Sequence, residues 1–421
     1  MQSSIKLRLT VMNFLQFAVW GAYLTSMGRY LGTAGFGSEI GNFYAMQGLV
    51  SLFMPALMGI VADRWIPAQR LLGLCHTLAG MLMLGVFLYT QTDTPSYPTL
   101  FALYSLSVAF YMPTLALSNS VAYTSLDQAG LDLVKSFPPI RVFGTVGFIC
   151  TMIAVSLLGL EATSGQFAVS AIISLVLAVY AQTLPNCPTA PKGQSKSLVE
   201  ALGLRAFVLF KQRKMALFFI FSMLLGVSLQ ITNGFANPFI STFGEIPAYA
   251  DTFGVKYANI LISLSQLSET LCILLIPFAL RRFGIRRVML IAMVAWVLRF
   301  ALLGLGNPGN GVWLFLLSMI VYGVAFDFFN VSGSLFVDKE TDPSIRSSAQ
   351  GLFMIMTNGI GATLGSLGAQ AVINHFVYSE HDTTAILAGW SMSWYVFAAY
   401  AAVVAVLFAL LFRYNTVTEA K

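Results

Sequence analysis

Three ionisable residues, Arg141, Glu269 and Asp327, occur inside strongly apolar segments of this sequence. Asp327, for example, directly follows the run Ile-Val-Tyr-Gly-Val-Ala-Phe. A charged side chain at the centre of a bilayer costs about 2.5–3.5 kcal/mol on an insertion scale. Because such a cost is seldom tolerated without a use, we interpret these residues as parts of a water-accessible pathway through a helical membrane protein.

The composition indicates the same class of protein. Of the 421 residues, 57% are hydrophobic and only 10% are charged, whereas soluble domains contain about 25% charged residues. The basic start, Met1 to Arg8, is followed by an apolar run without a small-residue cleavage site, so we expect a first membrane span and no cleaved signal peptide. The four cysteines are scattered, and their spacing suggests neither a disulfide framework nor a metal site.

The apolar segments predict an all-α integral membrane protein with twelve transmembrane helices in two six-helix halves. Each segment is close to the 20 or so residues that a spanning helix requires. We expect an N-terminal six-helix bundle over 1–184, a polar cytoplasmic linker over 185–214 and a C-terminal six-helix bundle over 215–421. The predicted spans are 9–28, 40–61, 71–90, 99–121, 139–160, 166–184, 215–240, 257–279, 288–305, 312–334, 348–373 and 391–412.

Basic residues predict the orientation, because Lys and Arg are enriched in cytoplasmic loops. One side of the predicted membrane has only Arg29 and Lys256, among several acidic residues. We therefore expect both termini and the central linker to be cytoplasmic. The opposite, cytoplasmic side has Lys6, Arg8, Arg64, Arg70, Lys135, Lys192, Lys196, Arg205, Lys211, Arg213, Lys214, Arg281, Arg282, Arg286, Arg287, Lys339, Arg346, Arg413 and Lys421.

Polar and aromatic residues recur at helical spacing within several spans. Residues three, four or seven positions apart share one face of a helix. Buried amides, carboxylates and an arginine suit a polar, uncharged solute, and aromatic rings can stack on a flat base. We therefore favour a nucleoside-like solute over an amino acid or an ion. The shared faces are Arg141 with Thr145 and Phe148; Gln230 with Asn233 and Asn237; Gln266 with Glu269; and Tyr322 with Phe326, beside Asp327.

Prolines, small residues and one further arginine predict local structure within the spans. Pro138 and Pro139 should fix the start of the helix that carries Arg141, and Pro238 should weaken the seventh span. The spacing of Gly361, Gly365 and Ala369 predicts a close helix–helix approach. Arg299 lies about as deep as Glu269, and we expect a structural role for it, as an ion-pair partner, rather than solute contact.

Two sets of motifs resemble known transporters. The loop Gly59-Ile-Val-Ala-Asp63-Arg64 resembles that of the major facilitator superfamily, and a second basic turn occupies the corresponding place at Arg281–Arg287. Four longer stretches resemble the nucleoside:proton symporter family within that superfamily, and the likeness runs over nearly the whole chain. These stretches are Phe137–Phe148, Leu229–Asn233, Ser265–Thr270 and Val321–Asn330.

The resemblance implies proton-coupled uptake of nucleosides such as uridine and adenosine across a bacterial inner membrane, by alternating access of two repeats. One departure is Gly234, where relatives carry a larger apolar residue, so the cavity beside Asn233 could be wider here. The residues that match the family's central cavity are Arg141, Thr145, Phe148, Gln230, Asn233, Gln266, Glu269, Tyr322, Phe326 and Asp327.

A proton symporter needs a group that gains and loses a proton during transport. Glu269 and Asp327 are the carboxylates that lie deep in the predicted spans. We favour Asp327 as the proton carrier because Phe326, Phe328 and Phe329 should desolvate it, and desolvation favours the neutral form of a carboxyl group. Glu269, one helical turn from Gln266, is then a solute contact, although the two roles could be reversed.

Two alternatives belong to other classes of solute or protein. A carrier of the same fold could transport a sugar, which would favour a site rich in tryptophan and acids with little ring stacking. A membrane enzyme would require a cluster of metal ligands or a nucleophile beside a base, and the sequence contains no such cluster. A receptor would require a sizeable soluble output domain. We therefore expect a monomeric transporter, not an enzyme, that contacts membrane lipid and has no cofactor and no nucleic-acid partner.

Overall fold

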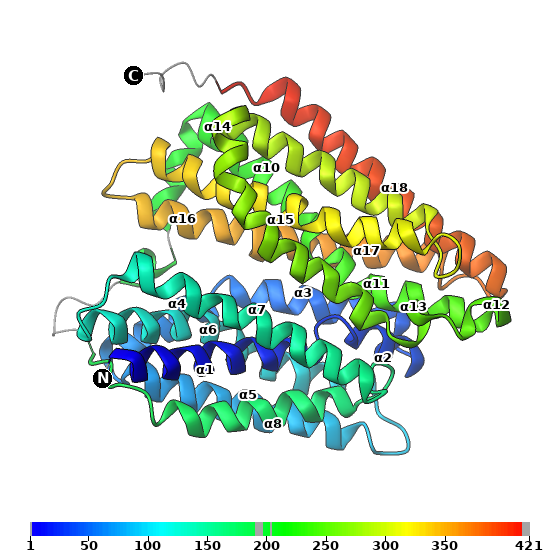
Figure 1. Cartoon of the computed structure of the whole chain (residues 1–421), viewed down its shortest axis with the longest axis horizontal. Coiled ribbons are helices and arrows are strands. Elements are labelled where there is room, and N and C mark those ends of the chain that lie inside the picture. The colour runs from blue at the N-terminus through cyan, green and yellow to red at the C-terminus, as the bar shows by residue number, and fades with distance from the viewer. Residues whose placement is uncertain (1, 190–196, 203, 415–421) are drawn as a thin grey trace. The chain divides into compact units, whose positions relative to one another are not determined.

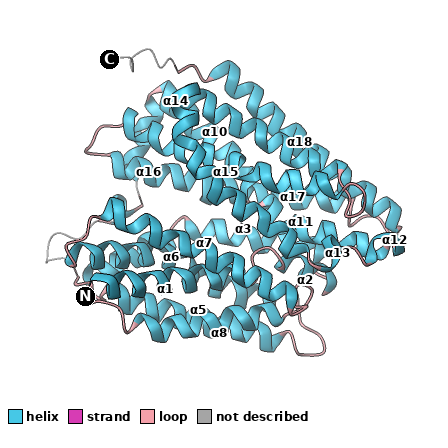
Figure 2. Ribbon diagram, in the orientation of Figure 1, coloured by secondary structure: helices cyan, strands magenta, loops and turns pink. Residues whose placement is uncertain are grey.

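The structure is a computed structural model that describes residues 2–189, 197–202 and 204–414. The described residues are helices joined by loops and turns, without a strand among them (Figure 2). Lys192, Lys196 and Lys421, which contribute to the predicted charge asymmetry, lie outside these ranges. The chain divides into two compact units, Met1–Phe36 with Met46–Leu202 and Gly37–Ala45 with Gly203–Lys421. The predicted bundles, 1–184 and 215–421, remain a prediction.

The first unit is built mainly from long helices that run beside one another (Figure 1). Two predicted spans are divided into shorter helices, the first at residues 22–26 and the second near Phe53. The third helix belongs partly to each unit. The helices are α1 (Gln2–Gly21), α2 (Met27–Thr33), α3 (Ile40–Ser51), α4 (Met54–Arg64), α5 (Ala68–Tyr89), α6 (Tyr97–Gln128), α7 (Leu133–Leu157), α8 (Gly165–Ala181) and the short α9 (Leu198–Ala201).

The second unit combines long helices with short helical turns. Residues Ile355–Gly361 form a π-helical segment between α16 and α17. The 3₁₀ turns are η1 (Gly37–Glu39), η2 (Leu204–Lys211) and η3 (Phe243–Glu245). The helices are α10 (Arg213–Leu229), α11 (Ile231–Thr242), α12 (Pro247–Ala250), α13 (Phe253–Lys256), α14 (Ala258–Leu305), α15 (Val312–Glu340), α16 (Arg346–Met354), α17 (Ala362–Phe376) and α18 (Thr383–Leu411).

The helices account for the twelve predicted spans. In the described part of the chain, nine helical stretches are long and apolar enough to cross a membrane. The stretch Ala258–Leu305 is 48 residues long and contains a non-helical residue, Gly284, with φ 75° and ψ 163°. Because glycine tolerates positive φ, this position separates the predicted eighth and ninth spans. α1 and the shorter apolar α8 complete the set.

The prolines act at other places than the sequence predicts. Pro138 and Pro139 lie inside α7, which begins at Leu133, so they do not mark its start. The first turn instead begins at Asp132, whose carbonyl accepts a hydrogen bond from the Ser136 amide at 2.9 Å. Likewise, Pro238 lies inside the continuous helix α11.

The seventh span is interrupted at Gln230, two turns before Pro238. Gln230 separates α10 from α11 and has φ −90° and ψ −11°. The Gly234 amide still donates to the Gln230 carbonyl at 3.0 Å, so the chain resumes its helical course at once. The interruption therefore falls on a residue that the sequence predicts to bind solute.

The cores of both units depend on close contact between helices. In the first unit, α1, α5, α6 and α8 share a buried cluster of apolar residues that includes Leu9, Leu72 and Val121. In the second unit, a Cβ atom at Gly365 would lie 2.0 Å from the Val227 carbonyl oxygen, and one at Gly361 would lie 2.4 Å from the Met223 carbonyl oxygen. The predicted close approach of the Gly361–Gly365 face is thus confirmed, with α10 as its partner.

Candidate functional site

In the first unit, α7 carries the predicted site residues Arg141, Thr145 and Phe148, and glycines hold it against α1. A Cβ atom at Gly147 would lie 2.1 Å from the Phe14 carbonyl oxygen. A Cβ atom at Gly144 would lie 2.6 Å from the Phe17 ring. Only glycine permits backbones to approach so closely. Gly144 and Gly147 therefore let α7 pack closely against α1, and this contact positions the helix face that carries the predicted site residues.

Aromatic rings surround this face of α7. The Arg141 guanidinium lies over the Phe17 ring, 4.0 Å from the ring centroid, which is a favourable cation–π arrangement. The Phe148 ring contacts Trp20 edge-on, with centroids 6.4 Å apart. Arg141 and Thr145 are half-buried and Phe148 is buried. The residues thus present one cation, one hydroxyl and one ring at successive turns.

A buried polar network supports the helices next to this face. Gln16 Nε2 donates to Thr114 Oγ1 at 2.7 Å, and Gln16 Oε1 lies 2.8 Å from His76 Nε2. His76 Nδ1 lies 2.9 Å from Ser174 Oγ, and the Tyr111 hydroxyl donates to the Gln16 carbonyl at 2.8 Å. The network joins α1, α5, α6 and α8. His76 thus bonds to partners that lie 98 and 60 positions away in the sequence.

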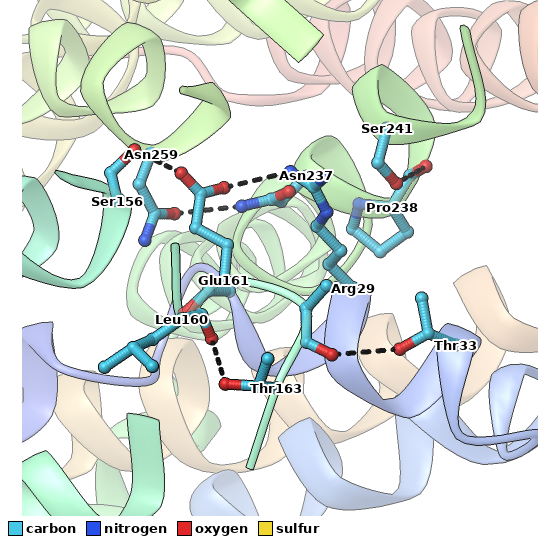
Figure 3. A network of polar contacts seen from close by, with 12 residues as sticks. Arg29, Thr33, Ser156, Leu160, Glu161, Thr163, Asn237, Pro238, Ser241 and Asn259 are labelled. Carbon is cyan, nitrogen blue, oxygen red and sulfur yellow. Dashed lines mark hydrogen bonds and ion pairs between the residues drawn. The ribbon is translucent and has the colours of Figure 1, made fainter. Parts of the chain in front are cut away.

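In the second unit, Gln230 and Asn233 form one polar surface at the start of α11. Asn233 Nδ2 donates to Gln230 Oε1 at 2.9 Å, and both residues are half-buried. Asn237, predicted to share their face, is buried and donates to Asn259 Oδ1 of α14 at 3.0 Å (Figure 3). Asn237 therefore joins helices, whereas Gln230 and Asn233 keep exposed polar surface.

Figure 3 also shows a buried acid in the first unit. Glu161 accepts a hydrogen bond from Ser156, and its Oε2 lies 3.4 Å from Arg29 Nη1. Arg29 is one of two basic residues on the side of the membrane that we predict to be external. Because the buried charge of Glu161 is paired and hydrogen-bonded, we interpret it as structural.

The two deep carboxylates lie on the neighbouring helices α14 and α15. A Cβ atom at Gly323 would lie 2.5 Å from the Ser268 carbonyl oxygen, and the Ser268 hydroxyl donates to the Ile320 carbonyl. Glu269 directly follows Ser268 on α14, and Asp327 lies one turn after Gly323 on α15. The contact therefore places the two carboxylates on adjoining turns of packed helices.

Asp327 is the more buried of the two carboxylates. Its exposed fraction is 5%, and its Oδ2 atom has no hydrogen-bond partner among the described residues. Its neighbours Phe328 and Phe329 are also buried. Gln266 and Glu269 on α14 are half-buried. The amide and the carboxylate of α14 are therefore more accessible than the carboxylate of α15.

Aromatic residues and Arg299 complete this region. The Tyr322 and Phe326 rings are stacked, with centroids 5.6 Å apart and an interplanar angle of 15°. The Arg299 guanidinium lies 4.5 Å from the Tyr322 ring centroid, and its Nη1 donates to the Ser318 carbonyl at 2.8 Å. Arg299 is structural, as expected, but the predicted ion pair is wrong, because its described partners are a ring, a carbonyl, the Ser265 hydroxyl and the Met319 sulfur.

Gly234 does not leave an empty space beside Asn233. A Cβ atom at Gly234 would lie 3.1 Å from Cδ2 of the Tyr44 ring, and Tyr44 is fully buried. Tyr44 belongs to the segment Gly37–Ala45, which packs within the second unit. The expected wider cavity is therefore occupied at this point by the Tyr44 ring, whose position the sequence does not predict.

The segment Gly37–Ala45 is held to α17 by two amide side chains. The Gly41 amide donates to Gln370 Oε1 at 2.5 Å, and Gln370 Nε2 donates to the Gly37 carbonyl at 3.0 Å. Asn374 Nδ2 donates to the Ser38 carbonyl at 3.2 Å. We call these three bonds the α17 clamp. It fixes the place of Tyr44 against α11.

Comparisons with known proteins show the family of the chain. Residues 3–417 match the sequence family described as nucleoside H⁺ symporter. The chain belongs to the nucleoside H⁺ symporter family. Its function is proton-coupled nucleoside uptake. The xanthosine permease of Escherichia coli strain K12 is 50% identical over 415 residues, which are 98% of this chain and 97% of that protein.

Solved structures establish the fold of this symporter. The crystal structure of the nucleoside transporter NupG matches with a TM-score of 0.89 at 45% identity, covering 98% of this chain and 100% of that chain. The xylose transporter XylE from Escherichia coli matches with a TM-score of 0.61 at 13% identity, covering 98% and 100%. The second likeness concerns the fold alone. The symporter is a multi-pass membrane protein with the major facilitator fold.

The ten predicted site residues of the symporter are distributed over both units. Arg141, Thr145 and Phe148 lie in the first unit. In the second unit the structure places Glu269 and Asp327 on the packed helices α14 and α15 and stacks Tyr322 on Phe326. No group of His, Cys, Asp and Glu that could hold a metal ion occurs among the residues that the structure describes. The remaining predicted residues of the second unit are Gln230, Asn233 and Gln266.

Proposed function

We propose that nucleosides bind to the amide, carboxylate and aromatic side chains identified above. The observation that carries the proposal is found on α15, where the stacked rings of Tyr322 and Phe326 adjoin the buried carboxyl group of Asp327. A flat base can stack on such rings, and a proton can be held by the neighbouring carboxyl group. Substrate and proton would thus be bound within one turn of a single helix.

The amides Gln230, Asn233 and Gln266 provide the hydrogen bonds in this proposal. An amide side chain offers two donors and an acceptor, which suits base edges and ribose hydroxyls. Gln230 and Asn233 already align through their mutual hydrogen bond. The interruption of the helix at Gln230 supports a binding role, because interrupted helices expose polar groups in transporter sites. Glu269 would accept hydrogen bonds from the ribose.

Residues of the first unit would contact the same solute during the transport cycle. Phe148 offers a ring, Arg141 a cation and Thr145 a hydroxyl, all on one face of α7. Their half-buried or buried positions within close-packed helices would limit their motion, and a pre-organised contact loses less entropy on binding. We propose that this face and the second unit's site act in alternating access to the two sides of the membrane.

Asp327 is the proton carrier in this mechanism. Burial of a charged carboxylate with an unpartnered oxygen is costly, so a proton would neutralise Asp327 when its surroundings are closed to water. Opening to water would remove the cost and release the proton. Glu269, which is half-buried, would keep the role of a solute contact.

Uptake by the full chain in proteoliposomes tests the proposal. Labelled uridine, adenosine and xanthosine are compared with and without an inward proton gradient; xanthosine is included because a relative is named for it. We expect at least one nucleoside to accumulate only with the gradient, and unlabelled nucleosides but not xylose to compete. Competition by the sugar alone would instead favour the alternative of a sugar carrier.

The orientation and the state of assembly are further parts of the proposal. We infer that both termini and the central linker are cytoplasmic in a bacterial inner membrane, that the chain is a monomer and that it catalyses no reaction. The positive-inside distribution supports the orientation. Single cysteines placed at Ser3 and at Thr383 should react with an impermeant thiol reagent from opposite sides of the membrane. Labelling of both from the same side would reject the proposed topology.

A further inference from the structure

A groove with a strongly basic lining lies where α10 begins and α18 ends, away from the residues of the nucleoside site. Its volume is about 520 Å³. Both helix ends belong to the second unit and, in the proposed orientation, lie at the cytoplasmic membrane surface. The lining residues are Arg213, Lys214, Leu217, Leu410, Leu411, Phe412 and Arg413.

The charges of this groove are only partly compensated. Lys214 forms an ion pair with Glu340 and lies 5.4 Å from the Tyr414 ring centroid. Arg213 and Arg413 are exposed, and neither has a carboxylate partner within the described ranges of the chain. Two arginines that flank one groove offer planar donors that match phosphate oxygens. The basic rim is therefore complementary to a phosphate diester.

The wall of the groove is apolar and faces outward. Leu410 is 64% exposed and Leu411 is 45% exposed, while Leu217 is half-buried. These leucines lie in helices that span the membrane, so their exposed surface suits acyl chains. The backbone at the end of α18 is held in place, because Arg286 donates to the carbonyls of Ala409 and Phe412.

We propose that this groove binds an anionic phospholipid, with the phosphate between Arg213 and Arg413 and an acyl chain along Leu410 and Leu411. Basic groups next to an apolar surface at the cytoplasmic side of a transmembrane bundle are suited to anionic lipid headgroups. A soluble phosphate would use the arginines but not the leucines. The inference rests on the proposed orientation and is independent of which residues bind nucleoside.

Lipid retention by the purified full-length protein tests the inference. Native mass spectrometry would compare phosphatidylglycerol with phosphatidylcholine for the wild type and for the variant Arg213→Gln/Arg413→Gln. Each cation near an anionic surface contributes about fivefold in binding, so we expect about a 25-fold loss of preference for phosphatidylglycerol. The matched control is Arg281→Gln/Arg282→Gln, which removes two exposed basic residues of the same predicted side, outside the groove.

Each outcome decides the proposal. Retention of the preference by the control and its loss in the groove variant would support the site. Equal loss in both variants would overturn it, because attraction to the whole basic surface would then be sufficient. Complete displacement of the lipid by millimolar inorganic phosphate would show a small-anion site and would also overturn it.

A second variant tests the apolar wall. Leu410→Ser/Leu411→Ser should weaken phosphatidylglycerol retention while leaving the thermal unfolding midpoint in detergent unchanged. Unaltered lipid retention would reject the placement of the acyl chain. Nucleoside binding, measured in the same samples by calorimetry, separates this proposal from the proposed function. Loss of lipid preference with normal nucleoside binding would support the lipid groove and would leave the proposed nucleoside function unchanged.

Discussion

Both units contain an arginine inside a predicted membrane span whose guanidinium lies over an aromatic ring. Arg141 lies 4.0 Å from the Phe17 centroid, and Arg299 lies 4.5 Å from the Tyr322 centroid. Arg141 is half-buried, whereas only 2% of Arg299 is exposed. Arg299 also donates to Ser318 and Ser265. The pairing of an arginine with an aromatic ring thus occurs twice. Arg141 keeps part of its polar surface exposed, whereas Arg299 is enclosed.

The difference in exposure between Arg141 and Arg299 shows that depth in a span does not by itself identify a transport residue. Arg299 is held by Ser265 of α14 and Ser318 of α15, and it supports the Tyr322 ring, on which we expect the base to stack. Arg141 keeps accessible surface on the face of α7 that carries Thr145 and Phe148. Glu269 and Asp327, the carboxylates that we propose for proton exchange, lie in the same unit as the enclosed Arg299. We therefore expect proton exchange to depend on the second unit.

The largest expected effect is the loss of coupling in Asp327→Asn. The amide resembles the protonated acid but cannot release a proton, so accumulation against a gradient should be abolished while counterflow exchange continues. Uptake into proteoliposomes with and without a proton gradient measures both. A variant that still concentrates nucleoside with normal proton dependence would remove Asp327 from the mechanism. Glu269→Gln, in parallel, should reduce binding more than coupling.

Replacement of Arg299 should mainly reduce stability, whereas replacement of Arg141 should mainly reduce nucleoside binding. Arg299→Gln should lower stability by about 2–4 kcal/mol, because it removes a cation–π contact and leaves the buried Ser318 carbonyl without its donor. Arg141→Gln loses a half-exposed cation–π contact with Phe17, so it should lower stability by no more than about 1 kcal/mol while weakening nucleoside binding. Unfolding midpoints and calorimetric binding constants of both variants test this difference. Equal loss of stability in both variants would contradict the comparison.

Single alanine substitutions at Gln230, Asn233 and Gln266 should each weaken nucleoside binding by about tenfold or more. The loss of one partner in a buried hydrogen bond costs about 1–3 kcal/mol, and 1.4 kcal/mol is tenfold in affinity. Calorimetry with uridine and adenosine measures the change. Asn237→Ala is the control, because the bond of Asn237 to Asn259 should affect stability instead. Normal binding by all three site variants would show that the amides are not contacts.

The smallest predicted effect is that of Phe326→Leu. Loss of an aromatic pair costs about 0.5–1.5 kcal/mol beyond the buried area, so nucleoside binding should weaken by about two- to twelvefold with little change in the unfolding temperature. Phe329→Leu, at a fully buried ring of the same helix, should show the opposite pattern. If the two variants lose binding and stability in the same proportion, Phe326 is a core residue.

The sequence predicts the features that depend on local pattern. Apolar segments of about 20 residues identify the spans, and helical spacing identifies the shared faces of α7 and α15. The glycine face at Gly361 and Gly365 is equally local, because small residues at this spacing permit contact with any partner helix. These features are set by each segment's own composition, so no knowledge of neighbouring helices is required.

Other features depend on partners distant in the sequence and could not be predicted. Tyr44 contacts Gly234 across about 190 positions, and His76 meets Ser174 across 98. The interruption at Gln230 likewise has no local breaker residue, while Pro238 is accommodated within a helix. Arg299 was expected to pair with an acid, but the structure places a ring and two oxygens of distant residues against it. Tertiary packing decides each of these cases.

The α17 clamp has a consequence for how this part of the chain can vary. Gln370 and Asn374 bond to backbone groups of Gly37, Ser38 and Gly41, so the side chain of Ser38 is not recognised. A Cβ atom at Gly41 would lie 2.5 Å from the Ser366 carbonyl oxygen, so that position admits no larger residue. Among natural relatives, position 41 should therefore accept only glycine. Position 38 should accept side chains of different chemical types, because only its backbone carbonyl is bound.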